Sequence, residues 1–88
     1  MLKYHVYVLR NSEGRFYIGV SEDVAVRLAQ HNSGGSGWTR SRGPWALAWT
    51  SEAMSLGEAR RQENWLKRQK GGVGFFRPTG LTKNGPGS

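Results

Sequence analysis

Apolar and polar side chains alternate in two short stretches near the start of the chain. Residues 3–10 read KYHVYVLR and residues 15–20 read RFYIGV. A period of two, rich in aromatic and β-branched residues, is typical of a strand with one buried face. The NSEG sequence between them favours a turn, so we expect an antiparallel hairpin.

The length of that turn decides which side chains share a face. A two-residue turn would place Tyr7 and Tyr17 on opposite faces, because a slip of one residue turns a strand over. A three-residue loop over residues 12–14, with Gly14 left-handed, places both tyrosines on one face with His5 and Gly19. We favour this second register because it leaves the other face apolar, formed by Val6, Val8, Phe16, Ile18 and Val20.

The pattern changes to a helical period after the hairpin. Ser21 is a suitable N-cap for a first helix over about residues 22–32. Positions about 100° apart on this helix form the expected apolar arc. This arc consists of Val24, Ala25, Leu28 and Ala29.

A third strand and a second helix follow. In residues 45–50, WALAWT, large side chains alternate with small ones as in a half-buried strand, with Trp45, Leu47 and Trp49 on one side. Ser55 and Glu58 have the spacing of a capping box, and the helix after them extends to the glycine pair that begins at residue 71. Its expected buried stripe contains Leu56, Ala59 and Leu66.

These elements predict an α/β fold with a small three-stranded mixed sheet flanked by helices. The sheet would consist of the N-terminal antiparallel hairpin and the third strand. We expect one domain over residues 3–76. Residues 77–88, rich in glycine and proline, are expected to form a flexible tail.

Charge and composition narrow the possible functions. Thirteen Lys and Arg residues against six Asp and Glu residues give a formal charge of +7, which favours a nucleic acid as partner, although a basic balance can also serve solubility alone. The absence of cysteine excludes disulfides, thiolate chemistry and cysteine-based zinc sites. No stretch approaches the roughly 20 apolar residues of a membrane span. We therefore expect a soluble, cytoplasmic protein without membrane contact.

Three charged or titratable side chains occupy positions that packing alone does not favour. Arg27 and His31 lie one turn apart at the border of the first helix's apolar arc. Glu63 falls inside the buried stripe of the second helix, where an unpaired carboxylate costs several kcal/mol. Two partners for Glu63 stay open: a salt bridge to Arg27 or Arg61, or a metal ion. A single carboxylate suits Mg²⁺ or Mn²⁺ that keeps most of its waters.

The sequence resembles the GIY-YIG nuclease domain, in particular the short standalone bacterial type related to the nuclease half of the excinuclease C subunit. HVYVLRN stands at the first motif, and Tyr17, Ile18 and Gly19 form the second. Arg27 follows at the family's spacing, and RLAQHNSG, WTRSRGPW and EARRQENWLK resemble the standalone subgroup. Glu63 matches the metal-binding glutamate. The region after it, around residues 75 and 76, lacks an asparagine that several relatives carry.

This resemblance implies hydrolysis of a phosphodiester bond by water with one divalent ion, Mg²⁺ or Mn²⁺. It implies that Tyr7 accepts or relays the proton of the water, while Tyr17 orients the cluster. Arg27 would stabilise charge on the phosphate, and His31 would polarise the water or hold Tyr7. Glu63 would bind the metal.

Basic and aromatic residues outside this cluster are candidates for nucleic-acid binding. Arg40, Arg42 and Lys67 would contact phosphates, and Trp38 would stack on a base. No element clearly reads base edges, which favours weak sequence preference or selection of nicked, flapped or branched DNA, as in repair or recombination. Two alternatives remain: a catalytically inactive nucleic-acid-binding module, and a basic RNA-associated structural protein.

Overall fold

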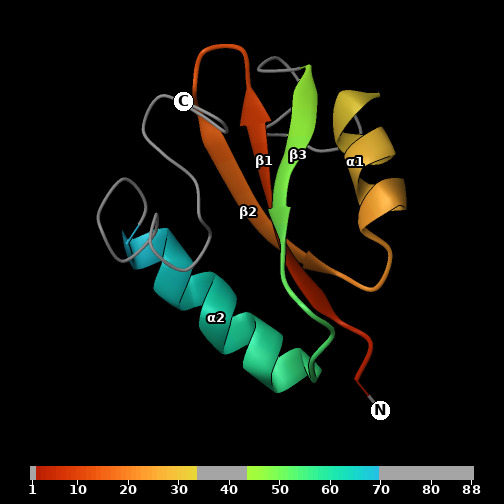
Figure 1. Ribbon diagram of the computed structural model, residues 1–88, viewed down its shortest axis with the longest axis vertical. Coiled ribbons are helices and arrows are strands. Elements are labelled where there is room, and N and C mark those ends of the chain that lie inside the picture. Colours follow the sequence, from red (N-terminus) through yellow and green to blue (C-terminus); the bar gives the residue numbers. More distant parts are fainter. Residues whose placement is uncertain (1, 34–43, 70–88) are drawn as a thin grey trace.

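Three strands and two helices form the part of the chain that the computed structural model describes, residues 2–33 and 44–69 (Figure 1). In chain order they are β1 (His5–Asn11), β2 (Phe16–Ser21), α1 (Val24–Asn32), β3 (Trp45–Thr50) and α2 (Leu56–Gln69). No helix within these ranges is long and apolar enough to cross a membrane. The predicted domain end at residue 76 and the predicted tail lie outside the described residues.

The strands form one sheet in the order β2-β1-β3, with β1 antiparallel to both neighbours. The predicted three-stranded sheet with flanking helices is confirmed, but the sheet is antiparallel throughout rather than mixed. The reason is that α1 returns the chain to the end of the sheet where β2 began (Figure 1). β3 therefore runs in the direction of β2, opposite to the central β1.

The hairpin has the three-residue loop that the sequence favours. Gly14 has a φ of +82°, and its N–H donates to the carbonyl of Asn11 at 3.1 Å. The Asn11 side chain closes the loop further, since its Oδ1 accepts from the N–H groups of Glu13 and Arg15 at 3.0 and 2.9 Å. The resulting pairing places Tyr7 and Tyr17 on the same face, as predicted.

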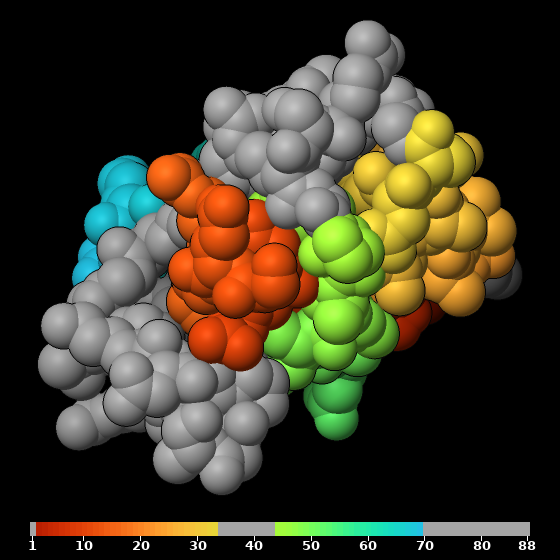
Figure 2. All heavy atoms as spheres, turned by 90° about the horizontal axis from the view of Figure 1, so that it is seen from above, coloured from red at the N-terminus to blue at the C-terminus, as the bar shows by residue number. Residues whose placement is uncertain are grey.

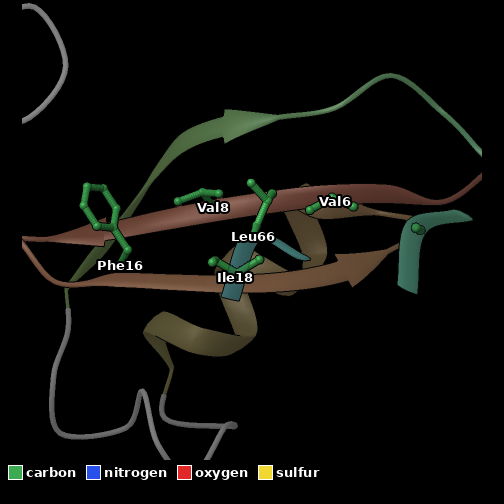
Figure 3. Close-up of a cluster of buried hydrophobic side chains, with 6 residues drawn as sticks. Val6, Val8, Phe16, Ile18 and Leu66 are labelled. Carbon is green, nitrogen blue, oxygen red and sulfur yellow. The ribbon is translucent and has the colours of Figure 1, made fainter. Parts of the chain in front are cut away.

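The sheet separates two apolar clusters. On one face, side chains of β1 and β2 pack against Ala59 and Leu66 of α2, as Figure 3 shows for Leu66. On the other face, Val24 and Leu28 of α1 pack against a second cluster that contains Leu9. In the view from above, α1 lies beside β3, and the end of α2 emerges beyond the β1–β2 hairpin (Figure 2). The first cluster includes the predicted apolar face: Val6, Val8, Phe16 and Ile18, with Val20 packed against them.

A bulge in β3 reverses the alternation that its sequence suggests. The pairing of β3 with β1 shifts by one residue at Ala48. Trp45 consequently joins the cluster on the α1 face, whereas Trp49 packs against the cluster on the α2 face. The prediction that these two tryptophans share a side with Leu47 was wrong, because the extra residue turns the remainder of the strand over.

Polar side chains define where both helices begin. Asp23 is the N-cap of α1, and its Oδ1 accepts from the N–H of Val26 at 3.1 Å. The predicted cap, Ser21, instead accepts from the N–H of Asp23 at 3.0 Å and forms the turn before the helix. At α2 the predicted capping box is confirmed, since the N–H of Glu58 donates to Ser55 Oγ at 3.2 Å and Glu58 Oε1 accepts from the Ser55 N–H at 3.4 Å.

Candidate active site

Tyr7 lies at the centre of the polar face. Its side chain comes from the central strand and is only 1% exposed. The ring covers the backbone of Gly19 so closely that a Cβ at Gly19 would lie 2.5 Å from the Tyr7 hydroxyl oxygen. A glycine is therefore required at the second motif, because a larger residue would need the space that the phenol occupies.

Two side chains of α1 reach the Tyr7 hydroxyl. The oxygen lies 3.0 Å from Nε2 of His31, which is 2% exposed, and Arg27 is close enough to lower the pKa of the hydroxyl. Arg27 and His31, predicted at the border of the apolar arc, lie on the packed side of the helix. Ala25 and Ala29 are exposed instead. The helix turns this way because the sheet beneath it presents polar aromatic groups, which can pair with a guanidinium and an imidazole.

Burial shifts the pKa values of Tyr7 and His31 in opposite directions. Burial raises the pKa of the Tyr7 hydroxyl against the opposing effect of Arg27, and the charges of Tyr17 and Glu63 raise it further. Burial and the adjacent Arg27 charge lower the pKa of His31. At neutral pH the phenol therefore keeps its proton and the imidazole is neutral. The His31 tautomer that carries its proton on Nδ1 accepts a hydrogen bond from Tyr7.

Tyr17 and Trp45 complete the aromatic part of the cluster. The Tyr17 ring lies 4.6 Å from that of His31 and meets Trp45 edge to face at 6.4 Å, measured between ring centroids. Asn32 fixes the backbone of Trp45, because its Nδ2 donates to the carbonyl at 2.9 Å and its Oδ1 accepts from the N–H at 2.6 Å. Neither role was predicted from the sequence. The only signal for Asn32 was its place directly after His31 in RLAQHN.

The two hydrogen bonds from the Asn32 side chain to the Trp45 backbone form what we call the Asn32 clamp. Loss of this clamp should destabilise the protein. Asn32→Ala leaves two part-buried backbone groups of Trp45 without these partners, so we expect the free energy of unfolding to fall by about 1–3 kcal/mol. Urea denaturation followed by tryptophan fluorescence measures this. Gln30→Ala, an exposed substitution on the same helix, should cost much less. Equal losses in the two variants would show that the clamp contributes nothing specific.

Glu63 projects from α2 and is 8% exposed. Its Oε2 lies 3.2 Å from Nζ of Lys67, and its Oε1 lies 3.8 Å from a guanidinium nitrogen of Arg60. The salt bridge that sequence analysis considered, to Arg27 or Arg61, was therefore assigned to the wrong partners, since residues one turn away on the same helix are nearer. Leu56, which was expected in the buried stripe of α2, is 41% exposed.

The two helices approach the polar cluster from opposite faces of the sheet. The Tyr7 hydroxyl lies over Gly19 on the edge strand β2, and α2 packs against this strand and β1. The charge of Glu63 is consequently close enough to raise the pKa of Tyr7. Tyr7, Tyr17 and His31 share direct contacts, and the charges of Arg27 and Glu63 act on Tyr7.

The donor chemistry of Glu63 fits a weakly coordinated hard cation. Within residues 2–33 and 44–69, no group of three His, Cys, Asp or Glu side chains is arranged to hold a metal. A single carboxylate suits Mg²⁺ or Mn²⁺ with a mostly aqueous coordination shell, whereas zinc requires more protein ligands. Both neighbouring cations are on side chains more than half exposed, 64% for Arg60 and 52% for Lys67, so they can leave the carboxylate.

The predicted nucleic-acid contacts divide into two groups. Trp38, Arg40 and Arg42 lie outside the described residues. Lys67 is described, and its ammonium group contacts Glu63. It therefore lies next to the candidate metal position rather than on a separate binding surface.

The antiparallel sheet with its two helices and its buried tyrosine–histidine cluster forms a small α/β domain. The profile of the GIY-YIG catalytic domain matches residues 3–74, so the chain belongs to the GIY-YIG family, and the resemblance seen in the sequence is confirmed.

Individual relatives carry the name UPF0213, which specifies no activity. The UPF0213 protein of Halobacterium salinarum is 42% identical over 66 residues, covering 74% of this chain and 86% of the relative. The UPF0213 protein of Aeromonas hydrophila is 43% identical over 65 residues, which are 73% of this chain but only 48% of that protein. A solution NMR structure of a UPF0213 protein from Bacillus halodurans superposes with a TM-score of 0.45 at 40% identity, covering 74% of this chain and 70% of the other.

Proposed function

We propose that the protein is an endonuclease that hydrolyses phosphodiester bonds in DNA with the help of one Mg²⁺ or Mn²⁺ ion. The observation that carries this proposal is the buried hydroxyl of Tyr7. It is hydrogen-bonded to His31, and the charges of Arg27 and Glu63 act on its pKa. The phenol thus has a proton acceptor, His31, and a neighbouring cation, Arg27, that can donate to phosphate oxygens.

Proton transfer is best supported as a relay. Because burial disfavours the Tyr7 phenolate, this residue does not store a negative charge before the reaction. Instead, it takes a proton from the attacking water while its own proton passes to His31 Nε2, 3.0 Å away. The lowered pKa of His31 keeps the imidazole neutral and able to accept that proton.

Arg27 and Tyr17 prepare the cluster for the phosphate. One guanidinium nitrogen of Arg27 donates to Gln30 Oε1 at 2.7 Å, which orients the group. Its remaining donors suit a non-bridging oxygen, where negative charge grows in the transition state. Tyr17 packs against the His31 ring and keeps Nε2 directed at Tyr7.

Glu63 is the residue that would hold the metal. A bound divalent ion supplies Lewis-acid stabilisation of the phosphate and the leaving oxygen.

Excess positive charge favours contact with the DNA backbone over reading of base edges. We therefore infer a weakly sequence-specific or structure-selective enzyme acting on nicked, flapped or branched DNA. A cytoplasmic role in DNA repair or recombination would supply such substrates.

Cleavage assays test this function. Wild-type protein is incubated with nicked, flapped and branched DNA in Mg²⁺, in Mn²⁺ and in EDTA, beside Glu63→Gln and the exposed control Glu52→Gln. Metal-dependent cleavage should fall by about tenfold or more in Glu63→Gln and stay within about twofold of wild type in the control. Cleavage that survives Glu63→Gln would reject the mechanism. Tight DNA binding without cleavage by any form would favour the inactive binding module.

Acid should destabilise the fold through His31. Its pKa in the folded protein lies below the value of about 6.5 of an unfolded histidine, so the unfolded chain binds more protons between the two values. The stabilising contribution is therefore complete above about pH 6.5 and is lost as the pH falls towards the folded pKa. Urea denaturation at pH values from about 7 to about 5 should show this slope in wild type and in His5→Gln. If the free energy of unfolding depends on pH to the same extent in His31→Gln, the dependence comes from another group.

A further inference from the structure

Both carboxylate oxygens of Glu63 face cations from its own helix. Lys67, one turn towards the C-terminus, is the nearer at 3.2 Å, and Arg60, one turn towards the N-terminus, lies at 3.8 Å. The carboxylate is nearly buried, whereas both cations are on largely exposed side chains. The buried group thus has a charge partner that can move into solvent.

This arrangement sets up a competition at one pair of oxygens. A metal ion bound by Glu63 requires the lone pairs that now accept from Lys67, and an ammonium so close to a divalent ion would be repelled. An ion pair with an exposed lysine contributes at most about 1 kcal/mol. Lys67 therefore faces the Glu63 carboxylate when no metal is bound, and the ion pair is weak enough to be displaced.

We propose that Lys67 holds the metal position at Glu63, is displaced when the ion enters, and then binds a phosphate of the DNA. This inference rests on the proposed function, because it assigns a task to a residue beside the proposed metal ligand. A displaced Lys67 ammonium stays within a side chain's length of the metal position and carries three donors that suit phosphate oxygens. Metal binding and DNA binding are then coupled, and each strengthens the other by the same factor.

The metal half of the proposal is tested by titration of Mn²⁺ into the purified full chain, with free Mn²⁺ followed by electron paramagnetic resonance at constant ionic strength. Lys67→Gln should bind Mn²⁺ about three- to fivefold more tightly than wild type, because the competitor is gone. Arg60→Gln should show a smaller gain, in keeping with its longer contact. The matched control is Arg68→Gln, which removes the same charge from the exposed neighbour of Lys67 and should change the affinity by less than about twofold.

The DNA half is tested in the Tyr7→Phe background, which suppresses cleavage. The affinity for a nicked duplex is measured by fluorescence anisotropy with and without Mn²⁺. The ion should strengthen DNA binding when Lys67 is present, and the enhancement should be at least about threefold smaller in Lys67→Gln.

The outcomes separate this inference from the proposed function. Equal Mn²⁺ affinities in wild type and Lys67→Gln would overturn the displacement of Lys67 and leave the metal-dependent nuclease intact. Equal gains in Mn²⁺ affinity in Lys67→Gln and Arg68→Gln would show that only overall charge matters. That result would also overturn the displacement of Lys67. Absence of Mn²⁺ binding in every form, including Lys67→Gln, would overturn both.

Discussion

Replacing Tyr7 by phenylalanine should lower DNA cleavage by about 10²- to 10⁴-fold while leaving the fold intact. The ring is 1% exposed and Phe fills the same space, so packing over Gly19 is retained. The change removes the hydroxyl that lies 3.0 Å from His31 Nε2, and with it the relay from water to the imidazole. Single-turnover cleavage of a nicked duplex measures the rate, and thermal unfolding checks the fold.

The matched control for this experiment is Tyr4→Phe. Tyr4 packs against the apolar cluster on the α2 face, away from the His31 side of the sheet. Its loss of a hydroxyl should leave the cleavage rate within about twofold of wild type, because it takes no part in proton transfer. Rapid cleavage by Tyr7→Phe would exclude Tyr7 from the chemical step.

Gly19→Ala should lower both stability and activity, because the added Cβ displaces the Tyr7 ring. A Cβ at this position would lie 2.5 Å from the hydroxyl oxygen of Tyr7 and 2.6 Å from its Cζ, so the phenol must move. We expect the free energy of unfolding to fall by about 1–3 kcal/mol, as in other overpacked cores. Cleavage should fall by about 100-fold, since displacement of the hydroxyl breaks its alignment with His31.

Two comparisons show whether this effect passes through Tyr7. In the double variant Gly19→Ala/Tyr7→Phe, cleavage should be no slower than in Tyr7→Phe alone, because both changes remove the same hydroxyl from its position. Gly57→Ala is the control for a change from glycine to alanine. A Cβ there meets only the Arg61 guanidinium at 3.7 Å, and the helical position favours alanine by about 0.5–1 kcal/mol. Additive losses in the double variant would assign the Gly19 effect to another cause.

Local sequence chemistry predicted the hairpin and the start of α2 correctly. The left-handed Gly14 fixes the loop length, and loop length with alternation fixes which tyrosines share a face. The capping box joins Ser55 to Glu58 within one turn, so no distant contact is needed. Features that depend only on neighbours along the chain are the ones that could be derived.

Features that depend on distant partners could not be derived. The bulge at Ala48 arises from the pairing of β3 with β1 and leaves no mark in WALAWT. The rotation of α1 was missed because apolar periodicity assumes an apolar surface beneath the helix, and the sheet instead offers Tyr7 and Tyr17. The same holds for Asn32, whose role consists of hydrogen bonds to a strand that begins 13 residues later.

The Asn32 clamp also has a consequence for the connection between α1 and β3. It joins the end of α1 to the beginning of β3, so the two ends of the intervening connection are fixed independently of what lies between them. The entropic cost of closing a connection rises only slowly with its length. We therefore expect the clamp itself to hold when the length of the connection between Asn32 and Trp45 changes.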